Sequence, residues 1–488
     1  MSRSITSYAL KGAALVLLVL LARKALVDTD LFNYDSLTYH LPFAARLWGI
    51  ASKEQFICQE HIELVYTGFP LLGEFLQGML WRLFAHIQAA NLVALSSLLL
   101  YCWFARAFLE IPWHLTFLAL VAVPLVQIHA TGSLVDLPAN LATAAVVLVT
   151  YRVYAGGADP PRWREIVALA VAAAISVNTK FLHTGVVALA LVAVGARLVW
   201  LSRRSGPGRR PLAGQLAFLI VAAPLIFATP IKNTALYGNP LYPIQVSLPG
   251  LTLPHAWVPR STVPSYLLGT PQPVRWLLSI FEFRAFDARR PYPWTGDQGY
   301  VPAGVPANRM GGYFFPYVTL NLLCFGFLIA TRRTRETRLA AGLFALLTVI
   351  TAVQPQSHEL RYYMYWIVVL ISLNLHFLAT ATRSPELPAL PLTAEQYGVA
   401  CLVFVAIVAG LSHGAYLRST TQPVMIAYTS AIEPAIRAGL EKSAALCVVG
   451  RTNSIFLYAD IFHAPLRYSV KAARTDEQCG SRVVVPAR

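Results

Sequence analysis

Charged residues are scarce in this chain. They make up 13% of its 488 residues, and hydrophobic residues make up 56%, whereas about a quarter of the residues in a soluble domain are charged. Several stretches also approach the roughly 20 apolar residues with which a helix crosses a bilayer. This composition excludes an ordinary soluble domain and predicts an all-α polytopic membrane protein.

The sequence predicts neither a cleavable leader nor a cysteine metal site. The first apolar stretch, residues 9–27, is too long for a secretory peptide and lacks a small-residue cleavage site, so we expect a retained helix. The six cysteines show no metal-ligand spacing, and Cys102, Cys324 and Cys401 lie in apolar stretches, where they are expected to pack. If the tail is external, Cys447 and Cys479 either form a disulfide or remain thiols; the sequence leaves both open.

Acidic residues are fewer than basic ones, 23 against 39, and the formal net charge is +16. This excess does not indicate nucleic-acid binding, because the arginines gather in short loops between apolar stretches. Short loops rich in Lys and Arg mark the cytoplasmic side of a membrane protein. The loops are those with Arg162 and Arg164, with Arg203, Arg204, Arg209 and Arg210, and with Arg332, Arg333, Arg335 and Arg338.

The apolar stretches predict about 11 transmembrane helices. They cover residues 9–27, 88–108, 113–128, 137–154, 165–177, 181–201, 212–229, 313–330, 339–353, 362–379 and 397–417. With the N-terminus inside, all the basic loops, together with Arg106 and Arg383, fall on the cytoplasmic side. Residues 69–85 carry Glu74, Gln77 and Arg82 on one flank, and we expect an amphipathic helix in the membrane interface.

This threading leaves a set of external segments: residues 28–87, which contain juxtamembrane helices, 130–136, 178–180, 231–312, 354–361 and the tail from 412. Residues 231–312 are too long for a simple connector and predict an irregular lid. We divide the chain into a membrane domain, residues 1–417, and a small external domain, residues 418–488. A helix-like stretch at 431–441 and a strand-like run at 445–449 predict an α/β appendage in the tail.

The unusual polar residues converge on these external segments: Asp35, His40, Glu60, His61, Glu63, Asp136, Lys180, Lys232, His358, Glu359 and Arg361. Two carboxylates at one membrane level with cations nearby suit transfer from an anionic donor. One carboxylate can take a proton from an attacking hydroxyl, and the cations can hold a departing phosphate. Because charges near the bilayer are costly, a functional role is the default hypothesis.

Each of these residues also has a purely structural alternative. Asp35 and Asp136 can cap the helices that follow them, and Lys180 can snorkel to the headgroups. Glu60 and Glu63, with His61 between them, can form a solvated face or, less characteristically, bind a metal. Arg361 can simply pair with the neighbouring Glu359. The convergence of all of them on one face favours a site over these separate explanations.

The motifs at these positions resemble those of integral-membrane glycosyltransferases of the GT-C class, specifically the bacterial aminoarabinose transferase and protein O-mannosyltransferase group. The matching segments are Asp35 with Tyr39, 68–70 (Gly-Phe-Pro), 134–138 (Leu-Val-Asp-Leu-Pro), Thr179-Lys180, 237–243 and 358–362. Two departures stand out. Ser36 replaces the second acidic residue common in that group, and the basic residue often found before Pro70 is absent, which puts one phosphate contact in doubt.

The resemblance implies a sugar donor linked through phosphate to a polyprenyl chain, and inversion at the anomeric carbon. On this reading Lys180, aided by Arg361 or Lys232, neutralises the leaving phosphate. Asp35 deprotonates or orients the acceptor, and Asp136 positions the acceptor or assists. The residues expected to contact the acceptor or the sugar are Tyr39, His40, Glu60, His61 and Glu359, and Trp257, Trp276 and Trp294 of the lid are expected to stack on sugar rings.

We expect no required cofactor, although Asp35, Glu60, His61 and Asp136 offer possible ligands for a divalent metal. The acceptor is a lipid, a glycan or a protein. The expected location is the bacterial inner membrane, with the site facing the periplasm. A lipid transporter or flippase is the main rival, but the sequence shows no internal repeat and no clear pair of broken helices. A membrane scaffold with an external sensor tail is a third possibility.

Overall fold

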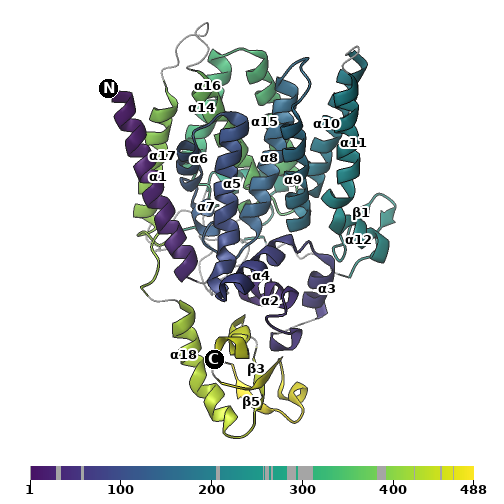
Figure 1. Cartoon of the computed structure of the whole chain (residues 1–488), viewed down its shortest axis with the longest axis vertical. Coiled ribbons are helices and arrows are strands. Elements are labelled where there is room, and N and C mark those ends of the chain that lie inside the picture. Colours follow the sequence, from purple (N-terminus) through teal and green to yellow (C-terminus); the bar gives the residue numbers. More distant parts are fainter. Residues whose placement is uncertain are drawn as a thin grey trace.

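The protein is a bundle of long helices with a small α/β unit at one end (Figure 1). The computed structural model describes residues 2–28, 35–56, 60–204, 209–256, 258, 263–264, 267–282, 293–294, 311–381, 392–421, 424–450, 453–464 and 466–487. The N-terminus lies at the end of the bundle away from the α/β unit. The C-terminus lies within that unit, beneath the bundle in the view of Figure 1.

A helix occupies each of the predicted spans. The bundle helices are α1 (Ser2–Val27), α5 (Leu92–Leu109), α6 (Trp113–Val121), α7 (Pro124–His129), α8 (Asp136–Ala155), α9 (Trp163–Thr179), α10 (Thr184–Arg204), α11 (Arg209–Ile226), α12 (Ala228–Tyr237), α14 (Phe315–Thr331), α15 (Arg335–Val353), α16 (Tyr365–Ala381) and α17 (Ala394–Leu411). Within the described residues, six helices are long and apolar enough to cross a membrane, or seven if the bent pair α11–α12 is one span. The figure of 11 crossings therefore stays a prediction.

The apolar residues are distributed as a bilayer requires. Helix α8 lies inside the bundle, with 83% of its most apolar window buried, whereas α1 has 22% buried. The outer helices expose large apolar side chains such as Val19, Val221 and Leu225. In water such a surface would be a liability, but against lipid tails it has no cost.

Two predicted spans are broken. Residues 113–128 form α6 and α7, which are separated by Ala122 and Val123, and Pro124 begins α7. Proline is tolerated in the first turn of a helix because that position needs no N–H donor. The break sets α7 apart from α6 and brings its last residue, His129, to the end of the bundle that carries the polar residues.

The second break lies between α11 and α12, which are bent by 57°. Pro230 has no N–H for the carbonyl of Ile226, four residues earlier, so that carbonyl needs another donor. The Asn178 side-chain amide donates to the carbonyls of Leu225 and Ile226 at 3.0 and 3.1 Å. Its own oxygen accepts the Thr229 N–H at 3.1 Å. One side chain thus satisfies the backbone groups that the bend exposes.

Short helices form a platform at the end of the bundle next to the α/β unit (Figure 1). They are η1 (Ser36–His40), α2 (Leu41–Leu47), η2 (Lys53–Gln55), α3 (Glu60–Gly68), α4 (Leu72–Phe84) and η3 (Ile87–Asn91). As predicted, α4 is amphipathic: Glu74 and Gln77 are buried while Leu83 and Phe84 are exposed. The prediction that Arg82 shares the flank of Glu74 and Gln77 is wrong. Arg82 is exposed because it lies roughly 80° around the helix from Glu74.

The tail forms the predicted α/β unit. It contains α18 (Val424–Leu440), η7 (Asn453–Tyr458), η8 (Asp460–Phe462), η9 (Asp476–Cys479) and a parallel sheet of β3 (Ala445–Val449), β4 (Ser469–Ala473) and β5 (Val483–Pro486) in the order β4-β3-β5. The continuous apolar run of β3 suits a central parallel strand, which is covered on both faces. A disulfide joins Cys447 and Cys479, which settles the alternative that the sequence left open.

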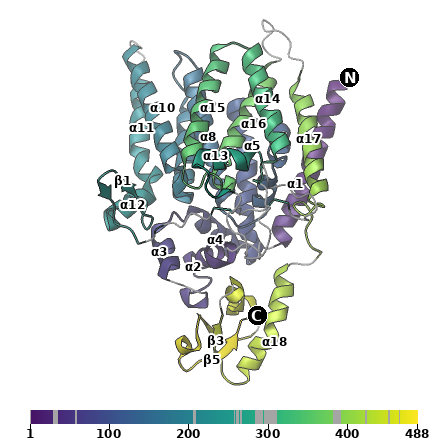
Figure 2. The same cartoon turned by 180° about the vertical axis from the view of Figure 1, so that it is seen from behind.

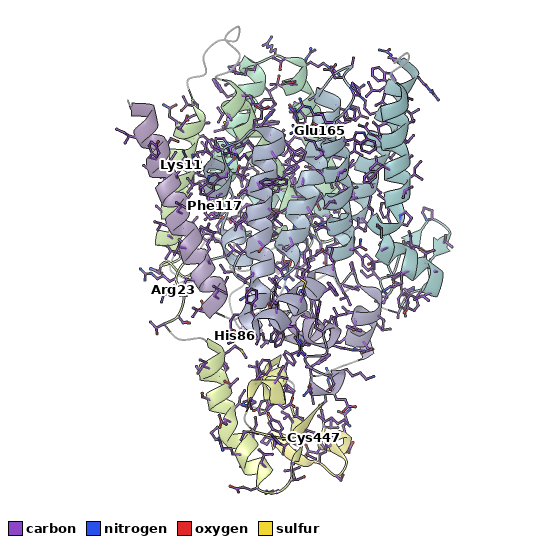
Figure 3. The ribbon with its side chains drawn as sticks, viewed as in Figure 1. Lys11, Arg23, His86, Phe117, Glu165 and Cys447 are labelled. Atoms are coloured by element: carbon purple, nitrogen blue, oxygen red, sulfur yellow. A yellow bond between two sulfur atoms is a disulfide. The ribbon has the colours of Figure 1, made fainter. Side chains whose placement is uncertain are left out.

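This unit packs on the platform through aromatic side chains. The Phe456 ring lies 6.2 Å from that of Phe56 and 6.4 Å from that of Trp81. The Gln55 amide donates to an Asp460 carboxylate oxygen at 2.5 Å. Figure 2 shows the same arrangement from behind, with the sheet next to α2 and α3. Figure 3 places Cys447 within the unit and His86 at the adjoining end of the bundle.

The predicted lid is only partly described. Its elements are α12, the hairpin of β1 (Ser247–Leu248) and β2 (Leu251–Thr252), and α13 (Gln272–Ile280). Trp276 packs against Trp366 at 5.4 Å and Trp294 against Phe314 at 5.3 Å, and both rings are buried. The prediction that these two rings stack on sugars is wrong, because they fill the helical packing. Trp257 lies outside the described residues.

Candidate active site

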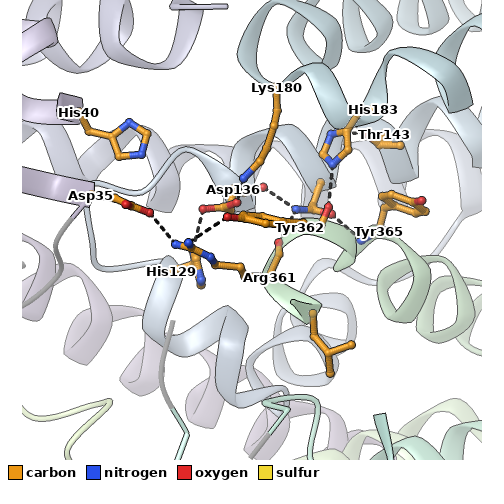
Figure 4. A network of polar contacts seen from close by, with 12 residues as sticks. Asp35, His40, His129, Asp136, Thr143, Lys180, His183, Arg361, Tyr362 and Tyr365 are labelled. Atoms are coloured by element: carbon orange, nitrogen blue, oxygen red, sulfur yellow. Dashed lines mark hydrogen bonds and ion pairs between the residues drawn. The ribbon is translucent and has the colours of Figure 1, made fainter. Parts of the chain in front are cut away.

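Four charged residues from four separate segments meet at one end of the bundle. Asp35 directly precedes η1, Asp136 is the first residue of α8, Lys180 lies between α9 and η4 (Phe181–His183), and Arg361 lies in η6 (Leu360–Tyr363). All four segments are among those predicted to be external. Figure 4 shows their side chains converging.

The four residues form two ion pairs. The Arg361 guanidinium lies 2.9 Å from the Asp35 carboxylate, and the Lys180 ammonium pairs with Oδ1 of Asp136. Asp136 is 2% exposed and Arg361 is 5% exposed. Removing such charges from water costs several kcal/mol per ion, which their attraction only partly recovers. An arrangement that costly is more readily explained by function than by stability.

The ring of Tyr362 brings the two cations together. The Lys180 ammonium lies 4.0 Å from the ring centroid and the Arg361 guanidinium lies 4.8 Å from it. Arg361 also donates to the Tyr362 hydroxyl at 3.1 Å. The face of an aromatic ring attracts cations, so one side chain holds both positive charges beside both carboxylates.

A buried network fixes the backbone beneath these charges. The Asn140 side-chain amide donates to the carbonyl oxygens of Asp136 and Arg361, at 2.8 and 2.9 Å, and its oxygen accepts the Tyr365 N–H at 2.9 Å. His183 lies within hydrogen-bonding distance, 2.9 Å, of both the Tyr362 carbonyl and the Thr143 hydroxyl. Helix α8 is thereby tied to η6 and η4, and the charged side chains start from a rigid base.

The contacts decide between several alternatives that the sequence left open. Asp35 makes no side-chain capping hydrogen bond to η1, so capping does not explain it. Lys180 turns inward to Asp136 and is not snorkelling outward. Arg361 reaches Asp35, from a distant part of the chain. Glu63 pairs with Arg46 of α2 at 2.8 Å, which is a contact within the platform.

The residues expected to bind sugar or acceptor are spread more widely. Tyr39 lies next to the charged residues, and burial, followed by the nearby Asp35 carboxylate, raises the pKa of its phenol well above the usual value. It therefore stays protonated and can donate a hydrogen bond. His40 is buried in the platform, 2.6 Å from the carboxylate of Glu74 on α4. Glu359, also buried, directly precedes η6.

Of three further predicted residues, Lys232 lies apart from this cluster, and the structure does not describe the side chains of Glu60 and His61. Lys232 is exposed on α12, and its ammonium donates to the Thr67 carbonyl at 2.7 Å. The structure does not bring it to Lys180 or Arg361. Glu60 and His61 begin α3, but their side chains lie outside what the structure describes. Within the described residues, no group of three or more His, Cys, Asp or Glu side chains is arranged to hold a metal ion.

Two buried residues at this end escaped the sequence analysis. His129 lies with Nδ1 3.9 Å from Oδ2 of Asp136. Glu282 accepts hydrogen bonds from the Trp294 indole at 2.8 Å and the Gly312 N–H at 3.0 Å. His129 directly follows the predicted span 113–128 and precedes Asp136 by seven residues, which is two turns of a continuous helix. That spacing was the only hint in the sequence that the two side chains lie close together. In the structure they belong to two separate helices, α7 and α8.

No protein-family model and no curated protein matches the chain. Among solved structures, it is similar to ArnT from Cupriavidus metallidurans in the apo state, with a TM-score of 0.53 and 14% identity over 100% of this chain and 90% of that one. It is also similar to ArnT from the same organism bound to undecaprenyl phosphate, with a TM-score of 0.49 and 14% identity over 98% and 89%. ArnT is an aminoarabinose transferase of the GT-C class. The first comparison shows that the chain has this GT-C fold, as the resemblance implied.

Proposed function

We propose that this chain, which shares the GT-C fold of ArnT, is an inverting glycosyltransferase. It moves a sugar from a polyprenyl-phosphate-linked donor to an acceptor hydroxyl or phosphate at the outer face of the bacterial inner membrane. The observation that carries the proposal is the pair of carboxylates, the half-buried Asp35 and the buried Asp136, each with its own cation, Arg361 or Lys180. A single displacement needs both kinds of group, one to accept a proton and the other to receive a departing anion.

Asp35 is the base in this proposal. It is the more exposed carboxylate, with 16% side-chain exposure against 2% for Asp136, so an acceptor hydroxyl reaches it more easily. The hydroxyl oxygen attacks the anomeric carbon, and its proton passes to Asp35. The bond from that carbon to the phosphate oxygen breaks, and its electron pair leaves with the polyprenyl phosphate. Asp136, paired with Lys180, orients the acceptor.

Lys180 and Arg361 receive the negative charge that grows on the leaving phosphate. Preorganised cations stabilise a transition state most where charge develops and water is excluded. Both are held against the Tyr362 ring, so little reorganisation is needed when the charge appears. Tyr39, which stays protonated beside Asp35, donates a hydrogen bond to the acceptor or to the sugar.

The disulfide supports the assignment of sides. Cys447 and Cys479 are joined in the tail unit, at the same end of the molecule as the site. Structural disulfides persist in oxidising compartments such as the periplasm and are rare in the cytosol. The arginine-rich loops lie at the opposite end, as the positive-inside rule requires of the cytoplasmic face.

The test is the release of polyprenyl phosphate by purified protein in liposomes supplied with a panel of synthetic polyprenyl-phosphate sugars and envelope extracts as acceptors. We expect the Asp35→Asn variant to transfer sugar about 10²- to 10⁴-fold more slowly, the range that a general base contributes. Glu63→Gln is the matched control, because it removes the charge of a carboxylate whose ion pair with Arg46 lies within the platform.

Two outcomes would contradict the proposal. If Asp35→Asn transfers sugar at the wild-type rate, the assignment of the base is wrong. If the wild type carries the labelled donor across the liposome membrane without cleaving it, the chain is a flippase. Addition of a chelator in the same assay tests the expectation that no metal is required.

A further inference from the structure

His129 has a buried imidazole beside the site. It is 0% exposed, and neither ring nitrogen has a hydrogen-bond partner among the described residues. Buried polar atoms are nearly always paired, so an unpaired imidazole calls for an explanation. His183, in the network beneath the site, makes the contrast clear, because both nitrogens of that ring are within 2.9 Å of partners.

The surroundings of His129 point to Asp136. The ring lies with Nδ1 3.9 Å from Oδ2 of that carboxylate, about one ångström beyond a hydrogen bond. The charged groups that act on it are Asp136 from α8, Lys180 after α9, Arg361 from η6 and Asp35 before η1. Full burial, with the charges of Arg361 and Lys180, outweighs the two carboxylates and lowers the pKa of the ring to about 4, so His129 is neutral at pH 7. Figure 4 shows it close to Asp136 and Arg361.

The Asp136 carboxylate has one oxygen committed and one facing His129. Oδ1 pairs with Lys180, which under the proposed function must turn to the donor phosphate. When that happens, Asp136 loses the cation it is paired with while remaining buried, and the nearby Arg361 stays paired with Asp35. Burial then favours the protonated form of Asp136. The acceptor would then meet a neutral carboxylic acid, which accepts a hydrogen bond more weakly than a carboxylate does.

We propose that His129 is the positioning residue that prevents this: it donates Nδ1–H to Oδ2 of Asp136 once a lipid phosphate has drawn Lys180 away from Oδ1. The inference rests on the proposed function and adds the order in which the donor and the acceptor bind. The donor binds first, Lys180 exchanges one anion for another, and the imidazole takes over the carboxylate before the acceptor arrives. The short helix α7 aims the ring, since its backbone is fixed by the Leu125 N–H donating to the Gly312 carbonyl at 3.0 Å.

The experiment measures proton uptake when a short-chain polyprenyl phosphate binds the full-length protein in detergent. Calorimetry at pH 7 in two buffers of different ionisation enthalpy gives the number of protons taken up. We expect close to none for the wild type and up to one for His129→Leu, because Asp136 is then left unpaired. His129→Asn keeps an N–H near the position of Nδ1 and should behave as the wild type does.

The sugar-transfer rate gives a second readout. His129→Leu should lower the rate with saturating donor about tenfold to a hundredfold, the effect of losing one hydrogen bond to a charged group, with little change in donor affinity. His183→Leu is the matched control: it removes a fully bonded buried imidazole, so it should lower the thermal midpoint without causing proton uptake.

The outcomes separate this inference from the proposed function. If the wild type does not bind the polyprenyl phosphate, the proposed function fails and takes this inference with it. If the wild type binds and His129→Leu takes up no proton, or His129→Asn behaves as His129→Leu does, His129 is a packing residue and the proposed function is unaffected.

Discussion

At the scale of single residues, the charged side chains of the site neutralise one another. Each carboxylate has a cation, and the cations share the Tyr362 ring. Breaking a buried pair by removing one partner typically costs about 3–5 kcal/mol, because a charge is left uncompensated. A ligand that replaces the lost partner avoids that cost. An anionic phosphate can do so for Lys180, and this makes the pair a natural point of exchange.

The two lysines predicted to hold the donor phosphate are therefore not equivalent. Lys180→Ala should weaken binding of a polyprenyl phosphate by about tenfold or more, as expected for one lost charge-assisted contact. Lys232→Ala should leave the dissociation constant nearly unchanged, because Lys232 is exposed and bonded to a backbone carbonyl of the platform. The measurement is a binding isotherm for each variant. An equal loss in both would mean that the phosphate lies near α12.

At the scale of elements, interruptions of the helices position the functional groups. The break before Pro124 brings His129 to the site, and the bend at Pro230 is stabilised by Asn178, two residues before Lys180. Hydrogen bonds also fix the end of the lid, near Gly312, where it meets the bundle. Glu282 has a left-handed φ of 55° and lies buried against Trp294 and Gly312. The Gly312 carbonyl also accepts a hydrogen bond from the Leu125 N–H of α7. Gly312 therefore connects the lid to the helix that carries His129.

The contribution of Glu282 to the stability of the folded protein should depend on pH. Burial raises the pKa of Glu282 from an ordinary 4.5 to about 7, so the folded protein binds this proton more tightly than the unfolded chain does. The stabilisation is fully present below about pH 4.5 and is lost as the pH rises through about 7, with at most about 3 kcal/mol at stake. Glu282→Gln mimics the neutral form and should flatten this dependence.

Thermal unfolding in detergent between pH 5 and pH 8 measures the effect. As the pH rises from 5 to 8, the thermal unfolding midpoint of the wild type should fall further than that of Glu282→Gln. Glu433→Gln, which alters an exposed pair with Arg437 on α18, is the control and should follow the wild type. Identical profiles for all three proteins would show that Glu282 does not titrate in this range.

At the scale of the whole molecule, the chain is a helical body with a tail unit seated on its platform. The aromatic contacts of Phe456 join the two, and the Cys447–Cys479 disulfide closes a loop of 32 residues within the tail. In the chain-entropy model such a loop stabilises the folded unit by about 3–4 kcal/mol. The unit lies on the platform, whose first helix, η1, directly follows Asp35 of the site.

The disulfide also tests the proposed orientation. Cells treated with a thiol-blocking reagent before lysis should yield a peptide pair linked through Cys447 and Cys479, detected by mass spectrometry without reduction. Cys324→Ser removes a buried free cysteine and should leave this pair intact. Recovery of both cysteines in blocked form would place the tail in a reducing compartment and reverse the proposed topology.

The sequence by itself determined the helical body and the grouping of its ends. Apolar run length and arginine position are local properties, and they were enough to locate a helix in each predicted span and to separate the basic loops from the segments that carry the site. The strand β3 and the helix before it could also be predicted in the tail, because their apolar patterns are local. The local pattern also singled out Asp35, Asp136, Lys180 and Arg361 as candidates.

Only the tertiary structure decided which of these charges meet. Asp35 and Arg361 are 326 residues apart, and their pairing depends on which helix ends are neighbours, which no local pattern encodes. The same holds for the burial of Trp276 and Trp294, for the position of Lys232 outside the cluster, and for His129 beside Asp136. Helix formation follows from nearby residues, whereas the choice of a buried partner follows from how the whole bundle packs.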